Sequence, residues 1–341
     1  MQQLSSGIDL SVEQSSWVMQ EILLGQVEKD LLKEFLLSLS NKGESALELQ
    51  TFVEVLFQHG TSIEIPDRCV DIVGTGGDGA NTINISTAAA IVTTAAGART
   101  IKHGNRAASS KSGSADLLEA LGVNIGLDGK AIAECVRKIG IGFAFAPNFH
   151  PAMKKAAPAR KELGIPTVFN LLGPLANPAR PKAFAIGVAK EEKLEAVANV
   201  LARRDCEGFV IRSDDGLDEI SLSGTSTIFV VSKGEVRKEI FDPASIGLER
   251  AALNELRGGD ANENAAITKA VFSGERSAFR EAILINAAVG ISAFKGDFAL
   301  GVEQQFANGY VYAKQAVDSG NAAALVSEWA KISNQLANAS L

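Results

Sequence analysis

The N-terminal part of the chain carries three apolar stripes at helical spacing, within residues 11–58. Ser11 and Gln14 form a capping-box pattern before the first stripe, and Gly25 follows its end. The pattern predicts three short helices. Three helices this apolar cannot bury all of their surface among themselves. We therefore expect part of it to pack on the rest of the chain or on a second subunit.

After Pro66 the pattern changes to short apolar runs that alternate with longer amphipathic segments. Candidate strands lie at 69–73, 100–102, 142–146, 183–188 and 208–211. Candidate helices lie at 87–96, 115–121, 130–139, 151–163 and 190–203. Such alternation predicts an α/β fold with a mostly parallel sheet and helices on both faces. Two further runs, 225–231 and 235–241, predict an antiparallel hairpin, and the chain reads as mostly helical from 262 onward.

A chain of this length could form one large domain or two domains of unequal size, and the change of pattern at Pro66 gives the boundary for two. A small helical domain would cover residues 1–66, and a larger α/β domain would cover 67–341. Within the larger one, Gly173, Pro174, Asn177 and Pro178 predict a non-helical path. We expect the segment 166–182 around them to pack on the helical domain.

Composition and charge narrow the class of protein. The chain has 341 residues, of which 46% are hydrophobic, and a formal net charge of −7. An acidic balance disfavours nucleic acid as a partner. The three cysteines are widely spaced and predict buried thiols in a reducing compartment. We see neither a signal-peptide pattern nor an apolar run long enough for a membrane span, so we expect a soluble cytoplasmic protein.

The most informative polar segment is DIVGTGGDGANTINIST, residues 71–87. An apolar strand enters a glycine-rich turn and then opens a helix, which presents unpaired N–H groups and the positive end of the helix dipole to an anion. This arrangement suits phosphate. Glycine-rich connectors are also common without any ligand, and GTGGD is neither the dinucleotide fingerprint nor the Walker loop. On its own, the segment leaves both readings open.

A second polar segment, KHGNRAASSKSGSADLLEALG, begins at Lys102. It combines Lys102, His103 and Arg106 with a run of serines before the next predicted helix. Either basic side chain could instead be a solvated surface charge. The two segments nevertheless occupy successive strand-to-helix junctions, which lie at the carboxyl edge of an α/β sheet, where ligands bind. Together they predict a substrate with more than one phosphate group.

Two other positions carry candidate chemistry. Arg160 lies in a basic helical segment, and a planar guanidinium can hold a carboxylate through two parallel bonds. Asp218 and Glu219 follow a predicted strand and could hold Mg²⁺, although such a pair alone is more often an acidic surface turn. The glycine-rich loop shifts the balance toward a metal site, because a polyphosphate substrate usually arrives with magnesium. The histidines His103 and His150 are well separated in the sequence and do not predict a transition-metal site.

Taken in order, the motifs GTGGD, NIST, KHGNR, FHPAMK, NLLGPLANP and DEISL resemble the anthranilate phosphoribosyltransferase family over almost the whole chain. The resemblance implies a phosphoribosyltransferase fold similar to that of the nucleoside phosphorylases. It also implies a Mg²⁺-dependent enzyme of tryptophan biosynthesis. Such an enzyme transfers the phosphoribosyl group of phosphoribosyl pyrophosphate (PRPP) to the amine of anthranilate, releasing pyrophosphate. The family is usually a cytoplasmic homodimer that associates through its helical domains.

The resemblance also implies roles for individual residues. Anthranilate would contact Gly74, Asn105 and Arg160. Magnesium would be held by Ser86, Asp218 and Glu219, and Lys102 and Arg106 would serve catalysis. The contacts to PRPP would be Gly74, Gly77, Asp78, Thr82, Asn84, Ile85, Ser86, Thr87, Lys102, His103, Gly104, Asn105, Arg106, Ala107, Ala108, Ser109, Ser110 and Ser114. Pro166 departs from the pattern, since many relatives carry arginine there.

Two alternatives from other classes can be distinguished by sequence. A pyrimidine nucleoside phosphorylase of the same fold would use phosphate and a nucleoside, and should lack the order GTGGD, NIST, KHGNR. A non-enzymatic relative that binds nucleic acid should have a basic surface and should lose the Asp218-Glu219 pair.

Overall fold

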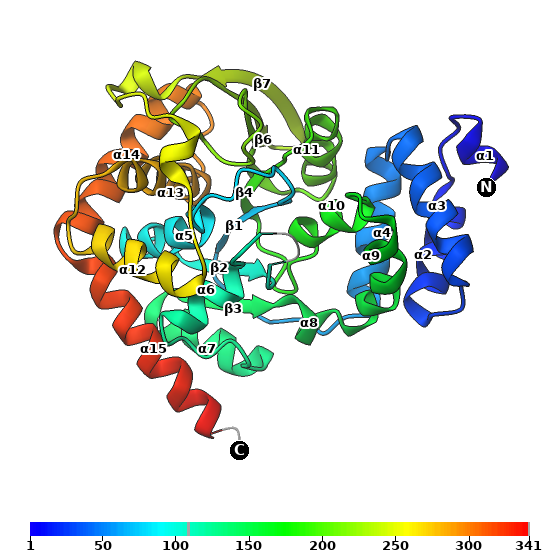
Figure 1. Ribbon diagram of the computed structural model, residues 1–341, viewed down its shortest axis with the longest axis horizontal. Helices are drawn as coiled ribbons and strands as arrows, with labels where there is room; N and C mark the ends of the chain where they lie inside the picture. The colour runs from blue at the N-terminus through cyan, green and yellow to red at the C-terminus, as the bar shows by residue number, and fades with distance from the viewer. Residues whose placement is uncertain (108–109, 340–341) are drawn as a thin grey trace.

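Seven strands form one sheet in the computed structural model, which describes residues 1–107 and 110–339. In chain order the strands are β1 Val70–Gly74, β2 Thr100–Gly104, β3 Ile141–Phe145, β4 Ala183–Gly187, β5 Glu207–Ser213, β6 Ser226–Ser232 and β7 Glu235–Phe241. Their order across the sheet is β3-β2-β1-β4-β5-β6-β7 (Figure 1). The five strands from β3 to β5 are parallel, and β6 and β7 are antiparallel. This confirms the mostly parallel sheet and the predicted hairpin.

The sheet has a topological switch point between β1 and β4. The chain runs outward from β1 to β2 and β3, and then returns to β4 on the other side of β1. Gly74 and Gly187 end these two strands and are partners in the register. In an open α/β sheet, the crevice beyond the carboxyl ends of such strands is where ligands bind.

Helices cover both faces of the sheet, as the sequence predicted. The principal ones after β1 are α5 Ile85–Ala95, α6 Ser114–Ala120, α7 Gly129–Ile139, α9 Ala157–Leu163, α10 Val168–Leu175, α11 Leu194–Arg203, α12 Ala261–Phe272, α13 Ala278–Lys295, α14 Val302–Asp318 and α15 Asn321–Ala339. On one face, α5 and α13 pack on each other and on β1; on the other face, α10 packs on β2 and α11 on β5. Side chains of β4 alternate between the two cores, with Ala185 on the α5 side and Phe184 on the α11 side. This alternation is what a sheet buried on both faces requires.

The N-terminal helices are α1 Gln2–Ser5, α2 Val12–Leu24, α3 Lys29–Lys42 and α4 Ala46–Gln58. The three predicted stripes are confirmed, and Ser11 and Gln14 form the predicted capping box. The buried faces of α2, α3 and α4 share one core with α9 and α10 from the middle of the chain (Figure 1). The segment 166–182 therefore lies partly among these helices. The domain boundary at residue 66 stays a prediction.

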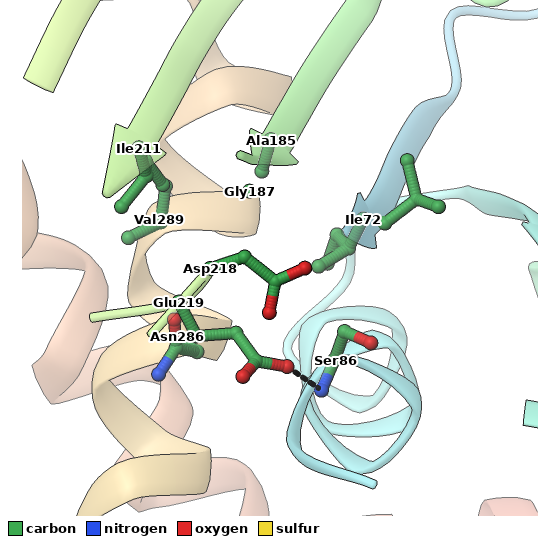
Figure 2. A pocket seen from close by; sticks show the side chains of 10 residues that line it. Ile72, Ser86, Ala185, Gly187, Ile211, Asp218, Glu219, Asn286 and Val289 are labelled. Carbon is green, nitrogen blue, oxygen red and sulfur yellow. Dashed lines mark hydrogen bonds between the residues drawn. The ribbon is translucent and has the colours of Figure 1, made fainter. Parts of the chain in front are cut away.

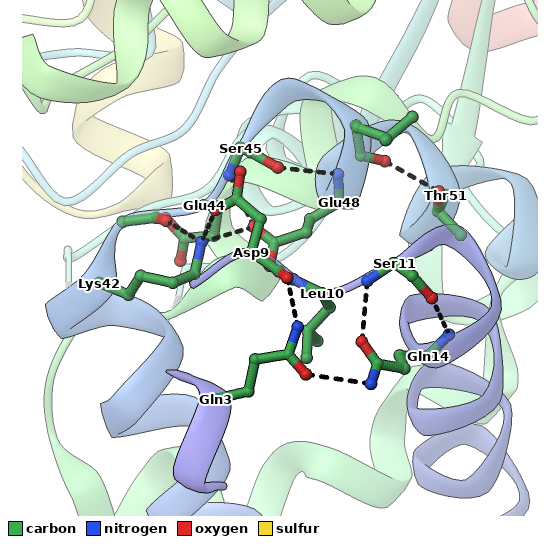
Figure 3. A network of polar contacts seen from close by, with 12 residues as sticks. Gln3, Asp9, Leu10, Ser11, Gln14, Lys42, Glu44, Ser45, Glu48 and Thr51 are labelled. Atoms are coloured by element: carbon green, nitrogen blue, oxygen red, sulfur yellow. Dashed lines mark hydrogen bonds and ion pairs between the residues drawn. The ribbon is translucent and has the colours of Figure 1, made fainter. Parts of the chain in front are cut away.

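A polar network fastens the N-terminal helices to one another (Figure 3). The Nζ atom of Lys42 lies 2.5 Å from Asp9 Oδ1 and 2.8 Å from Glu48 Oε2. The backbone N–H of Leu10 donates to Glu48 Oε1 at 2.9 Å. The Glu48 side chain is fully buried, and that of Lys42 is 3% exposed. A buried carboxylate is stable only when it is paired, so this network fixes how α3 and α4 meet the segment before α2.

Three predicted elements differ from the structure. The helix expected at 151–163 is a 3₁₀ turn, Pro151–Ala156, followed by α9, in which Pro158 occupies a first-turn position. The helix expected at 190–203 likewise begins as a 3₁₀ turn. The non-helical path expected at Gly173, Pro174, Asn177 and Pro178 is wrong for the first two, which lie inside α10, and is confirmed for Asn177 and Pro178, which follow it. Six of the eight residues of α10 are buried, and this apolar burial outweighs the hydrogen bond that Pro174 cannot make.

No helix within residues 1–107 or 110–339 combines the length and apolarity needed to cross a bilayer.

Candidate active site

Three carboxylates converge beyond the carboxyl ends of β1 and β4. Asp78 comes from the glycine-rich loop, residues 75–84, and Asp218 and Glu219 come from the loop after β5. One oxygen of each lies within 4.8 Å of the others. Figure 2 shows Asp218 and Glu219 pointing toward the first turn of α5, where Ser86 lies. The sequence identified the Asp218-Glu219 pair, but placed Asp78 only among PRPP contacts and missed it as a third acidic group.

Two glycines make room for this cluster. A Cβ atom on Gly74 would lie 2.9 Å from Asp218 Cγ and closer still to its Oδ2, and one on Gly187 would collide with the backbone carbonyl of Asp218. With hydrogen at both positions, the Asp218 loop can lie directly over the strand ends. There, Asp218 Oδ2 accepts a hydrogen bond from the N–H of Gly76 at 2.7 Å. The Oε1 atom of Glu219 accepts one from the N–H of Ser86 at 3.3 Å.

The electrostatics of the cluster favour a cation. Burial, and then the nearby Asp78, raises the pKa of Asp218 to about 7. Burial and the negative charge of Asp218 raise the pKa of Glu219 well above its usual range. Three carboxylate oxygens in a partly buried site beside a hydroxyl form a donor set that suits Mg²⁺, which prefers oxygen ligands. The residues present therefore fit a magnesium ion.

Lys102 lies beneath this cluster and is not a solvated charge. Its Nζ atom donates to the carbonyl of Ile72 and lies 3.3 Å from Ser86 Oγ. The side chain is buried, and burial lowers its pKa to about 8. Burial raises the pKa of the neighbouring Asp71 to about 6, an effect that the charge of Lys102 partly offsets. Lys102 thus lies next to Ser86 at the start of α5, and the sequence did not identify Asp71 as its charged neighbour.

Arg106 is placed differently. Its Nη1 atom pairs with Asp116 at 2.8 Å and with Glu119 at 2.6 Å, both on α6, and about half of the side chain is exposed. These acids hold its pKa above the usual range. Arg106 therefore lies at the surface, as the alternative interpretation of the sequence allowed, and is paired there with two acids. Its catalytic role stays a prediction.

The other expected PRPP contacts surround the start of α5. Thr82 and Asn84 lead into the helix, and Ile85, Ser86 and Thr87 form its first turn. Gly77 lies in the glycine-rich loop. Gly104 is the last residue of β2, and Asn105 and Ala107 follow it. Ser110 lies in the loop before α6, and Ser114 is the first residue of α6. Ala108 and Ser109 lie outside the described residues.

Arg160 lies on α9, between the N-terminal helices and the sheet. Its guanidinium lies 5.3 Å from the centre of the Phe169 ring, and its Nη2 lies 3.4 Å from Asn170 Oδ1. Burial lowers its pKa. No carboxylate among residues 1–107 and 110–339 forms an ion pair with it. A partly buried cation without a counter-ion suits a ligand carboxylate.

His103 and His150, which the sequence treated as separate, are neighbours with ring centres 5.6 Å apart. His103 Nδ1 lies 2.9 Å from the carbonyl of Gly173, and His150 Nε2 lies 2.7 Å from that of Ala176. Burial lowers the pKa of His103 to about 3. The pair therefore connects the end of β2 to α10 as neutral rings. Neither histidine belongs to the acidic cluster, which is the group of described residues that could hold a metal ion.

Known proteins match this arrangement over nearly the whole chain. Residues 66–323 match the model of the glycosyl transferase family, a/b domain. The anthranilate phosphoribosyltransferase of Rhodococcus jostii is 49% identical over 334 residues, covering 98% of this chain and 92% of the relative. That of Nocardia farcinica is 47% identical over 338 residues, covering 98% of each.

Two solved structures extend the match to the fold. The anthranilate phosphoribosyltransferase of Thermus thermophilus superposes with a TM-score of 0.90 at 37% identity, covering 98% of both chains. That of Saccharomyces cerevisiae, in complex with PRPP and Mg, has a TM-score of 0.86 at 29% identity, covering 96% of this chain and 94% of the other.

Proposed function

We infer the reaction from one premise, that this chain belongs to the anthranilate phosphoribosyltransferase family. It transfers the phosphoribosyl group of PRPP to the amine of anthranilate, giving N-(5-phosphoribosyl)anthranilate and pyrophosphate in tryptophan biosynthesis. The observation that carries this conclusion is the convergence of Asp78, Asp218 and Glu219 on the first turn of α5. A nucleoside phosphorylase fits less well, because the chain keeps the order GTGGD, NIST, KHGNR. A nucleic-acid-binding relative fits less well, because the chain keeps the Asp218-Glu219 pair and has a net charge of −7.

Magnesium would be held by the carboxylates of Asp78, Asp218 and Glu219, with the hydroxyl of Ser86 beside them. When bound, the ion offsets the negative charge that builds on the departing pyrophosphate. The anionic forms of Asp218 and Glu219, which burial and mutual repulsion disfavour, become favourable next to a divalent cation. The Saccharomyces cerevisiae relative, which is in complex with PRPP and Mg, supports the use of magnesium.

The phosphate groups of PRPP would lie against the glycine-rich loop and the start of α5. Backbone N–H groups and the positive end of the α5 dipole favour anions there. Lys102 adds a buried positive charge under Ser86, where it stabilises the leaving group without reorganising. Asn84, Thr87 and the residues from 102 to 110 would complete the contacts.

Anthranilate would lie between α9 and the end of β2. Arg160 would hold its carboxylate, and Asn105 would face its ring and amine. An aromatic amine is largely unprotonated at neutral pH, so the reaction needs no strong general base. What these residues must supply is orientation of the amine toward the anomeric carbon of the ribose.

Two finer features complete the proposal. Apolar side chains remain exposed on the N-terminal helices, with Trp17 65% exposed, Leu31 49% and Leu24 48%. This surface supports a homodimer formed through α2–α4. Three free, buried cysteines support a cytoplasmic location, where thiols stay reduced.

The test is the loss of anthranilate fluorescence on adding PRPP, first with Mg²⁺ and then with a chelator. We expect a loss that requires both PRPP and the metal, and that Asp218→Asn weakens strongly. Asp214→Asn is the matched control, because Asp214 is an exposed carboxylate of the same loop outside the cluster. Full turnover in the chelator, or equal effects of the two substitutions, would contradict the assignment.

A further inference from the structure

The end of the glycine-rich loop is hydrogen-bonded to residues 256–258, a segment far away in the sequence. The N–H of Ile83 donates to the carbonyl of Leu256 at 3.0 Å, and the N–H of Gly258 donates to the carbonyl of Asn81 at 2.9 Å. Between these two bonds, Thr82 and Arg257 form an antiparallel bridge. The exit of the loop toward α5 is therefore fixed by the backbone that leads into α12.

Asn264, in the first turn of α12, extends this link to a side chain of the site. It is 1% exposed. Its Oδ1 accepts a hydrogen bond from the N–H of Gly259 at 2.8 Å, and its Nδ2 donates to Asn84 Oδ1 at 2.9 Å. Because one end of the amide must accept and the other must donate, the side chain has a single satisfactory orientation.

Asn84 receives that bond at the position where α5 begins. Its Oδ1 also accepts from Ser112 Oγ at 3.0 Å, and its Nδ2 donates to the carbonyl of Ser112 at 3.0 Å. Two donors on the oxygen determine which way the amide faces. Only one of the two Nδ2 hydrogens has a partner among the described residues, and Asn84 does not cap its own helix. The second N–H is thus left for an anion at the start of α5.

We propose that Asn264 is a positioning residue for PRPP, which sets the amide of Asn84 so that an N–H faces the phosphate groups. The proposal rests on the proposed function, which places PRPP at the start of α5. Without Asn264, the Asn84 amide loses one of the two donors on its oxygen and can rotate to present that oxygen to the phosphates. An oxygen acceptor facing a phosphate is repulsive, so affinity for PRPP falls.

A purely structural role for Asn264 would have a different signature. Its bond to Gly259 N–H fastens the turn before α12, and losing it should lower stability without selecting one substrate. Asn264→Asp separates the two roles. The carboxylate still accepts from Gly259, but it cannot donate to Asn84 and sets an anionic oxygen against Asn84 Oδ1.

The experiment measures steady-state kinetics with Mg²⁺ while PRPP and anthranilate are varied in turn. For Asn264→Asp and Asn264→Ala we expect the KM for PRPP to rise about tenfold, as for the loss of one oriented hydrogen bond to a charged group. The KM for anthranilate should stay within twofold of the wild-type value. Asn262→Ala, an exposed change in the same helical turn, is the control and should match wild type.

A double substitution tests whether the effect passes through Asn84. Asn84→Ala with Asn264→Ala should bind PRPP no more weakly than Asn84→Ala alone. Additive losses, equal rises in both KM values, or an Asn264→Asp variant with wild-type KM for PRPP and a lowered Tm would each overturn the proposal.

The test of Asn264 can fail or succeed independently of the test of the proposed function. If the wild-type protein does not turn over anthranilate, the proposed function fails, and calorimetric titration with PRPP and Mg²⁺ still compares Asn264→Asp with wild type. If Asn264→Ala does not fold, Asn264→Asp alone decides, because it preserves the bond to Gly259.

Discussion

Adding one methyl group at Gly74 should disable the metal site while leaving the fold almost intact. In Gly74→Ala the new Cβ would lie 2.9 Å from Asp218 Cγ, whereas ordinary contacts of this kind are 3.4–4 Å. The obstacle is the far end of a side chain, so the carboxylate can withdraw and the strand need not move. Its hydrogen bond to the N–H of Gly76 and its place near Glu219 are lost instead.

The size of the effect follows from overpacking. Forcing the carboxylate back against the methyl group costs about 1–3 kcal/mol, which corresponds to a roughly 5- to 150-fold weaker response to Mg²⁺. Initial rates of anthranilate consumption, measured over a range of Mg²⁺ concentrations, would give this ratio. The midpoint of thermal unfolding should change little.

Gly187→Ala supplies the contrast. Its Cβ would meet the backbone carbonyl of Asp218, which cannot withdraw without moving the loop and the end of β4. We expect this variant to lose stability. Gly224→Ala, where nothing lies within 4 Å of the added atom, is the neutral control. Wild-type Mg²⁺ dependence in Gly74→Ala would refute the reasoning.

Other predictions concern metal binding, anthranilate binding and the proposed dimer interface. Because burial and nearby carboxylates raise the pKa of Asp218 to about 7 and only the ionised form binds a cation, affinity for Mn²⁺ should fall about tenfold from pH 8 to pH 6. Electron paramagnetic resonance would measure it, and a flat profile would contradict the coupling. Arg160→Ala should raise the KM for anthranilate about tenfold or more, since charge-assisted bonds are lost, and leave the KM for PRPP unchanged. Equal changes in both would refute its assignment. Trp17→Glu places a charge on the exposed apolar surface and should shift the sedimentation coefficient to that of a monomer; an unchanged coefficient at micromolar protein would argue against this interface.

Local signals accounted for much of the fold. The capping box at Ser11, the alternation of strands and helices, and the hairpin all depend on neighbouring residues, so they could be predicted from the sequence. Pro174 shows the limit of such reasoning. A proline argues against a helix locally, but the burial of α10 depends on elements far away in the sequence, and that burial dominates.

Parts of the candidate site could be predicted where a general rule of the fold, or the resemblance to a family, brought residues from distant parts of the sequence together. The rule for strand ends brought Lys102 and the glycine-rich loop together, and the phosphate site expected at that loop favoured a metal site at Asp218 over a surface turn. Side-chain contacts between segments far apart in the sequence had no signal of either kind. For this reason the approach of His103 to His150 and the link from Asn264 to Asn84 emerge only in three dimensions.

The hydrogen bond from the N–H of Ser86 to Glu219 means that the protein carries its own competitor for the α5 anion site. Any incoming phosphate must displace an internal carboxylate, which penalises a lone inorganic phosphate ion. If Glu219 were a ligand of a divalent cation together with Asp78 and Asp218, its oxygen would be less available to the Ser86 N–H, which could then bind a phosphate. Metal and diphosphate should therefore strengthen each other's binding by the same factor, as linkage requires. Such linkage would favour a metal-bound diphosphate over free phosphate at the start of α5.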